Sequence, residues 1–192
     1  LEREEFEAEI DFKLGSLNFL VTYHPVTLYK EGPKKAMLEI FKALNEFPSS
    51  RIIFTKPNSD TNNKIIGDMI DEYVKNNPDR TKSFVSMGHL KYFSAIKNID
   101  VVLGNSSSGL LEAPVFNKPT INIGDRQKGR LKASSVIDCE EKAELISQAL
   151  NQALSKDFQN SLSHIQNPYR GGNASKSISK TLKSFDLDGI LI

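Results

Sequence analysis

Three consecutive serines and a nearby carboxylate follow a short apolar run in the middle of the chain. Residues 99–103 (IDVVL) lead directly into residues 104–112 (GNSSSGLLE). This order predicts a strand, a tight turn and the start of a helix, with backbone N–H groups gathered at the turn. Small side chains let an anion approach the backbone, and the helix dipole favours a phosphate there. Because serine is also a common helix cap, a purely structural role is the alternative.

Polar side chains also follow the other apolar runs that the sequence predicts as strands. They are His24 after residues 19–23, Asn58 after 51–55, Ser86 and His89 after 83–85, and Arg126 after 119–123. The carboxyl ends of parallel strands meet at one edge of a sheet, so we expect these groups to line one cleft. Basic side chains could neutralise a diphosphate there, and Glu112, six residues after Ser106, could accept two ribose hydroxyls.

Each of these residues also has a structural explanation. His24, which precedes a proline, could be a structural histidine, and Asn58 could cap the helix that follows it. Arg126 could belong to an exposed basic loop formed by residues 126–130. Glu112 could be a solvated carboxylate on a helix. Their shared location at strand ends favours the cleft.

The elements that would position these side chains alternate between strand and helix. Short apolar runs predict strands at 19–23, 51–55, 83–85, 101–103, 119–123 and 135–137, and longer periodic segments predict helices at 33–47, 65–74, 90–96, 140–153 and 174–185. Continuous apolar strands are typical of sheets that are buried on both faces. The pattern therefore predicts an α/β fold, with a doubly wound, Rossmann-like parallel sheet.

Composition limits the classes of protein to which the chain can belong. We expect its 192 residues, 39% hydrophobic and 26% charged, to form one domain over 1–192, with a linker helix at 1–16 and a C-terminal helix at 173–185. A net charge of +1 gives no general attraction to nucleic acid, and no apolar run predicts a membrane span. The single Cys139 indicates a reducing compartment, so we expect a cytoplasmic protein.

Neither a metal nor a redox cofactor is expected. The three histidines show no ligand spacing, and one cysteine cannot form a cysteine-based zinc site. The G-x-G-x-x-G pattern of nicotinamide-binding domains is absent. The charged opening segment, residues 1–7, is typical of a connecting helix, so we expect the chain to be part of a longer protein.

Four segments carry a resemblance to a known family. Residues 21–27 (VTYHPVT), 104–112, 119–130 (PTINIGDRQKGR) and 167–174 (NPYRGGNA) resemble the C-terminal half of UDP-N-acetylglucosamine 2-epimerases, in the same order and over nearly the whole chain. The GDRQKGR loop is similar to the hydrolysing branch of that family. The non-hydrolysing branch usually carries a Thr-Glu-Arg-Pro-Glu-type loop at this place.

The resemblance implies a GT-B architecture, in which two Rossmann-like domains hold a nucleotide sugar between them. This chain would be the C-terminal, UDP-binding domain, and its partners would be UDP, a UDP-N-acetylhexosamine, the missing N-terminal domain and, in the full-length protein, a second copy in a homo-oligomer. The implied enzyme eliminates UDP from UDP-N-acetylglucosamine and adds water to the glycal, which yields N-acetylmannosamine for sialic or related nonulosonic acids. No cofactor is implied.

By the same resemblance, residues of this chain receive roles in binding UDP. Ser106, Ser107, Ser108 and Gly109 would hold the diphosphate, and His24 would contact the phosphates or assist the leaving group. Glu112 would bind the ribose, and residues 86–90, with Ser86 and His89, would hold uracil. Asn58 would line the cleft, and Arg126 would complete its polar wall near the diphosphate. The chain lacks a paired-carboxylate motif, so we expect the main acid and base in the N-terminal domain and no turnover by this chain alone.

Two other functions remain open at this point. A GT-B glycosyltransferase shares a nucleotide domain with a ribose-binding glutamate, and it predicts a reaction that depends on an acceptor. A non-catalytic UDP-sugar-binding module predicts binding without turnover, even in the whole protein. The GDRQKGR loop favours the epimerase over both.

Overall fold

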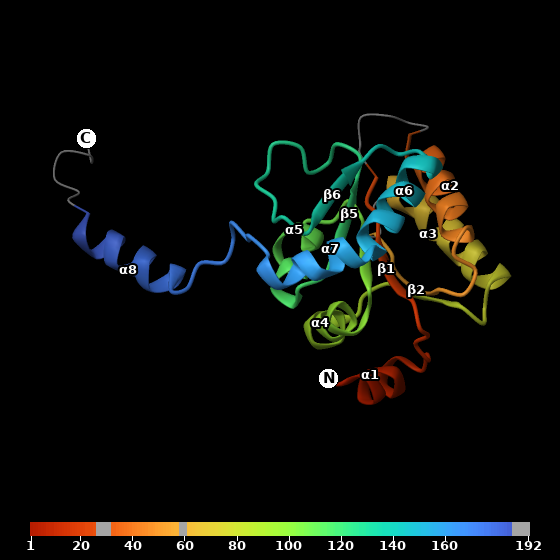
Figure 1. Cartoon of the computed structure of the whole chain (residues 1–192), viewed down its shortest axis with the longest axis horizontal. Coiled ribbons are helices and arrows are strands. Elements are labelled where there is room, and N and C mark those ends of the chain that lie inside the picture. Colours follow the sequence, from red (N-terminus) through yellow and green to blue (C-terminus); the bar gives the residue numbers. More distant parts are fainter. Residues whose placement is uncertain (26–31, 58–60, 186–192) are drawn as a thin grey trace.

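The computed structural model describes residues 1–25, 32–57 and 61–185 (Figure 1). Its centre is a six-stranded, wholly parallel sheet in the order β3-β2-β1-β4-β5-β6. The strands are β1 (Asn18–Thr22), β2 (Arg51–Thr55), β3 (Thr81–Phe84), β4 (Val101–Gly104), β5 (Thr120–Ile123) and β6 (Val136–Cys139). The doubly wound, Rossmann-like sheet predicted from the sequence is confirmed. Only β3 begins noticeably earlier than its predicted range.

Helices cover both faces of this sheet (Figure 1). They are α1 (Arg3–Ile10), α2 (Gly32–Asn45), α3 (Thr61–Asn76), α4 (Gly88–Asn98), α5 (Ser108–Leu111), α6 (Ala143–Leu154), α7 (Lys156–Ser161) and α8 (Ala174–Ser184), with short 3₁₀ helices η1 (Ala113–Phe116) and η2 (Leu162–His164). Helices α2, α3 and α6 pack on one face, and α1, α4 and η1 on the other. The sequence analysis missed α7 and η2, which carry too few apolar residues for a periodic pattern.

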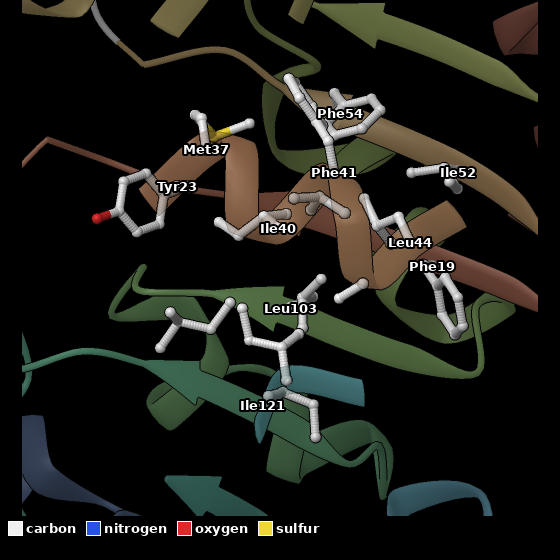
Figure 2. Packing of buried hydrophobic residues seen from close by; sticks show 14 of the residues in the cluster. Phe19, Tyr23, Met37, Ile40, Phe41, Leu44, Ile52, Phe54, Leu103 and Ile121 are labelled. Carbon is white, nitrogen blue, oxygen red and sulfur yellow. The ribbon is translucent and has the colours of Figure 1, made fainter. Parts of the chain in front are cut away.

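The alternation of side chains along β1 explains why both faces need a cover. Phe19 and Val21 point into the core under α2, whereas Leu20 points into the core under α4. Figure 2 shows Ile40 and Leu44 of α2 lying over Phe19 and Leu103 of the sheet. All five residues of β1 are buried, as expected for a central parallel strand.

Two helices, α1 and α4, differ in detail from the sequence predictions. The helical part of residues 1–16 ends at Ile10, after which Asp11 adopts a left-handed conformation, and Phe6 packs α1 under α4. In α4 the apolar side chains of Leu90 and Phe93 are exposed, and Ala95 and Ile96 face the sheet instead.

Helix α8 extends away from the rest of the molecule (Figure 1). None of its residues is buried, although Ile178 and Leu182 lie one helical turn apart and are large and apolar. No helix in the described part of the chain is long and apolar enough to cross a lipid bilayer.

The strand order determines where along the edge of the sheet a crevice for a ligand forms. The chain winds outward from β1 to β3, then returns to β4 beside β1 and winds outward in the other direction. Loops that follow β1 and β4 therefore diverge and leave a crevice between them. In open α/β sheets ligands bind in this crevice, at the carboxyl ends of the strands.

Candidate functional site

Asn105 joins three of the strand-end loops at the crevice. Its side-chain Oδ1 accepts a hydrogen bond from the backbone N–H of His24 at 2.7 Å, and its Nδ2 donates to the His24 carbonyl at 2.8 Å. The carbonyl oxygen of Asn105 in turn accepts from Nη1 of Arg126 at 3.0 Å and from Nε2 of Gln127 at 2.7 Å. The loops after β1, β4 and β5 are thus tied to one fully buried residue.

The serine turn lies directly after Asn105. The Ser106 hydroxyl accepts from the backbone N–H of Ser108 at 3.3 Å, and within the described residues the N–H groups of Ser106 and Ser107 have no acceptor. The expected helix is present but short: α5 has four residues, because Pro114 has no backbone N–H to continue the i→i−4 hydrogen bonds, and the chain goes on as the 3₁₀ helix η1. The anion-binding character of the turn therefore rests on its free N–H groups and hydroxyls.

Glu112 is the C-cap residue of α5 and leads into η1: its backbone is right-handed helical and its N–H donates to the Ser108 carbonyl at 2.9 Å, so it lies at a helix end, as the sequence predicted, rather than on a long helix face. The residue is half-buried, and its Oε2 is buried without a hydrogen-bond partner among the described residues. Nearby, the Tyr92 hydroxyl lies 2.6 Å from Oγ of Ser108. Burial raises the pKa of Tyr92, and the negative charge of Glu112 adds to this rise. Ser108 thus contacts Tyr92 through its hydroxyl and Glu112 through its backbone carbonyl. A buried acceptor without a donor is poised to receive a ligand hydroxyl.

His24 and Arg126 lie on the same side of the crevice. Burial lowers the pKa of His24, and the positive charge of Arg126 lowers it further. The site therefore holds one fixed charge beside a histidine that is neutral near pH 7. Arg126, Lys128 and Arg130 are all exposed, as an ordinary basic loop predicts, but Arg126 is also tied to Asn105 through one guanidinium nitrogen.

A hollow of about 320 Å³ lies beside the serine turn, between the end of β2 and the start of α4. Its lining residues are Thr55, Ser86, Met87, Gly88, His89 and Tyr92. Ser86 and His89, which the sequence analysis assigned to a base-binding segment, thus share one cavity. Tyr92 lines the hollow and contacts Ser108, so the hollow adjoins the turn.

Two predicted site residues, Gly109 and Asn58, differ from the others. Gly109 packs against β5: a Cβ on it would lie 2.6 Å from Cγ2 of Thr120, and its carbonyl accepts from the Thr120 hydroxyl at 2.8 Å. This close approach accounts for the glycine without any ligand. Asn58 lies outside the described residues.

Sequence reasoning did not single out Asn105, Gln127 or Tyr92. Asn105 stands directly after the strand-end Gly104, which is a signal for a residue that faces the crevice, but its partners are distant in sequence. Gln127 is almost fully buried within a loop of charged residues, and Tyr92 was hidden in an apolar helix pattern.

A larger hollow of about 660 Å³ opens on the side of α2 and α6. At one wall the Tyr23 hydroxyl donates to Glu141 at 2.6 Å, and Asp125, Lys128 and Lys142 line the space as well. Its charges are of both signs and largely paired. Across the residues that the structure describes, no three His, Cys, Asp or Glu side chains are grouped to hold a metal ion.

The sheet order and the crevice define a Rossmann-like domain of the type found in GT-B proteins. The family described as UDP-N-acetylglucosamine 2-epimerase matches residues 2–183, and the chain belongs to this family. One relative, "GDP/UDP-N,N'-diacetylbacillosamine 2-epimerase (hydrolyzing)" of Campylobacter jejuni, is 38% identical over 192 residues, which cover 100% of this chain and 50% of that protein. The "UDP-N,N'-diacetylbacillosamine 2-epimerase (hydrolyzing)" of Legionella pneumophila is 31% identical, over 96% of this chain and 47% of that protein.

Among solved structures, the Methanocaldococcus jannaschii UDP-GlcNAc 2-epimerase in complex with UDP-GlcNAc and UDP has a TM-score of 0.72 to this chain at 20% identity, covering 95% of this chain and 49% of that one. At this identity the likeness supports the fold alone. The chain spans about half the length of the curated relatives that it matches.

Proposed function

We propose that this chain is the UDP-binding half of a hydrolysing UDP-sugar 2-epimerase. Family membership, together with the GDRQKGR loop and the two relatives described as hydrolysing, supports this assignment. The whole protein would then act on a UDP-linked 2-acetamido sugar. We further propose a cytoplasmic location, a role in making sialic or related acids, and pairing into a homo-oligomer.

The nucleotide would lie across the carboxyl ends of β2, β1, β4 and β5. Its diphosphate would meet the free N–H groups of Ser106 and Ser107 and the side of the crevice on which His24 and Arg126 lie. Uracil would enter the hollow that Ser86 and His89 line. The distance between these two regions is bridged by Tyr92, which touches both.

The observation that carries the proposal is the unpartnered carboxylate oxygen of Glu112. A buried carboxylate oxygen without a donor is costly, and a ribose hydroxyl would remove that cost. Its neighbours Tyr92 and Ser108 place Glu112 between the base hollow and the serine turn, where the ribose of a nucleotide diphosphate would be.

In the proposed reaction a base removes the C2 proton of the sugar while the bond from C1 to the UDP oxygen breaks, which leaves a glycal. Water then adds across this double bond: a proton reaches C2 from the opposite face and hydroxide joins C1. The products are UDP and the free C2 epimer. Residues of this chain would bind the leaving UDP, and Arg126 would offset the charge that develops on it.

The acid and base would come from the part of the whole protein that lies outside this chain, because the described residues of the crevice include no pair of carboxylates. The sugar itself is suggested by the names of the relatives. Both the C. jejuni and the L. pneumophila proteins are described as acting on diacetylbacillosamine, a diacetamido sugar. We therefore propose a UDP-linked diacetamido sugar as the substrate, with UDP-N-acetylglucosamine as the alternative.

Calorimetry with UDP and ADP tests the binding part of the proposal. Selective binding of UDP is expected, and equal binding of both nucleotides would contradict it. For the reaction, the full-length protein would be supplied with each UDP sugar and assayed for UDP and for free sugar by mass spectrometry. Release of both without an acceptor supports the epimerase. A requirement for an acceptor would identify a glycosyltransferase, and binding without turnover a non-catalytic module.

A further inference from the structure

We propose that Asn105 is a positioning residue, which fixes His24 and Arg126 in the places from which they meet the diphosphate. The identity of the ligand, a diphosphate, rests on the proposed function, but the hydrogen bonds of Asn105 are present without any ligand. Asn105 is fully buried, makes no contact with the solvent and faces the loops rather than the crevice itself. It would therefore act through other residues.

An asparagine suits this position because its side chain both donates and accepts. The backbone N–H and C=O of His24 are both held by it, at 2.7 and 2.8 Å, so His24 is fixed at two points. An aspartate of the same shape keeps the acceptor and loses the donor. An alanine loses both and leaves two backbone groups of His24 without partners.

The main chain of Asn105 holds the opposite side of the crevice. Arg126 and Gln127 both donate to its carbonyl oxygen: Gln127 is buried within an exposed loop, whereas Arg126 stays exposed and is held through one guanidinium nitrogen. The His24 loop and the Arg126 loop are therefore fastened to the same residue, and their separation is set by it. A displacement near 1 Å at such a site can weaken function about a hundredfold.

The positive charge of Arg126 lowers the pKa of His24, so the midpoint of the His24 titration reports the distance between them. A general loss of stability would not change this midpoint. Among the described residues, Arg126 is the charged group whose field acts on His24, and burial acts in the same direction. If Asn105 sets their separation, altering it changes the titration of the His24 ring. A residue that merely fills the core would leave that titration as it is.

Asn122 provides a matched control. It is also buried, at 1% exposure, and it also lies at the crevice edge of the sheet, in β5 next to β4. Its amide donates to Asp138 at 2.7 Å and holds neither His24 nor Arg126. Asn122→Ala and Asn105→Ala thus remove the same group at the same depth, from different partners.

The experiment measures two quantities on the wild-type chain, Asn105→Ala, Asn105→Asp and Asn122→Ala. NMR follows the titration of the His24 ring, which His24→Gln assigns among only three histidines, and calorimetry gives the affinity for UDP. Asn105→Ala is expected to shift the His24 midpoint and to weaken UDP about tenfold or more, whereas Asn122→Ala leaves both within about twofold. Asn105→Asp should raise the His24 midpoint, because it adds a negative charge.

Asn105→Asp keeps the proposal testable if the alanine variant does not fold, because it preserves the size and one hydrogen bond. An unchanged His24 midpoint in folded Asn105→Asp would overturn the positioning role. Equal effects of Asn105→Ala and Asn122→Ala on UDP would overturn it as well. If the wild-type chain fails to bind UDP while the Asn105 variants shift the midpoint of the His24 titration, the result counts against the proposed function and supports the link between Asn105 and His24.

Discussion

Gly104 lies against the main chain of Thr22, so closely that a Cβ on Gly104 would be 2.0 Å from the Thr22 carbonyl oxygen. The same carbonyl accepts the backbone N–H of Asn105 at 3.1 Å. Gly104 also has a φ of 134°, which side-chain-bearing residues rarely adopt. The contact between β1 and β4 at the crevice therefore depends on the absence of a side chain.

Gly104→Ala is expected to destabilise the chain by at least about 3 kcal/mol, which lowers Tm by roughly 6–12 °C, and to abolish UDP binding. Gly67→Ala is the matched control: Gly67 lies within α3 and a Cβ there meets nothing within 4 Å. This variant should gain about 0.5–1 kcal/mol, because alanine favours helix. Thermal unfolding of both compares them, and a stable Gly104→Ala that binds UDP would refute the argument.

Glu112→Gln should weaken UDP about tenfold or more, since a hydrogen bond from ribose to a charged acceptor is replaced by a weaker one. The affinity for inorganic pyrophosphate, which lacks ribose, should change by less than about twofold. Calorimetry with both ligands gives the comparison. Glu46→Gln, at an exposed position of the chain, is the control for loss of charge. An equal loss of affinity for UDP and for pyrophosphate would mean that Glu112 acts through its charge on the whole site and not through the ribose.

The affinity for UDP should depend on pH through His24. Burial and Arg126 hold the pKa of the free His24 below its ordinary value of 6.5, and a bound diphosphate raises it. Between these two pKa values binding takes up a proton, so affinity rises as pH falls, by up to about tenfold per pH unit, and levels off below the pKa of the free form.

The phosphate of UDP titrates in the same range, so the measurement is the difference between the wild-type chain and His24→Gln from pH 5 to 8. The change His164→Gln, in exposed η2, should leave the wild-type profile unaltered. Superimposable profiles for the wild-type chain and His24→Gln would remove His24 from the phosphate site.

Cys139 should react slowly with alkylating reagents in the folded chain. Burial, aided by the charge of Asp138, raises the pKa of its thiol to about 12. At pH 8 the fraction of Cys139 present as thiolate is then ~10³-fold smaller than for an ordinary thiol. The rate at which iodoacetamide alkylates Cys139 should be smaller by the same factor, because the thiolate is the reacting form. Mass spectrometry follows this rate directly, because the chain has one cysteine. A rate in folded protein equal to that in urea would disprove the prediction.

Local patterns in the sequence were sufficient for the elements of the fold. Strand β2 matches its predicted run, and the other strands differ from theirs by at most a few residues. The central strands β1, β4 and β5 are buried along their whole length, as continuous apolar runs predict, whereas the edge strands β3 and β6 are only partly buried. The length of α5 was also encoded, through Pro114, although the sequence analysis did not use that signal. The exposed face of α4 was not predicted, since apolar periodicity does not reveal which neighbours a helix will have.

The sequence by itself thus determined where each strand ends to within about two residues, because secondary structure follows from the chemistry of neighbouring residues. Only the tertiary structure decided which strand ends meet. His24 and Asn105 are 81 positions apart, and they touch because β1 and β4 pair at the centre of the sheet. Strand order depends on the packing of both faces at once, so no short segment contains it. The partners of Asn105, and the buried, unpartnered oxygen of Glu112, are consequences of that packing.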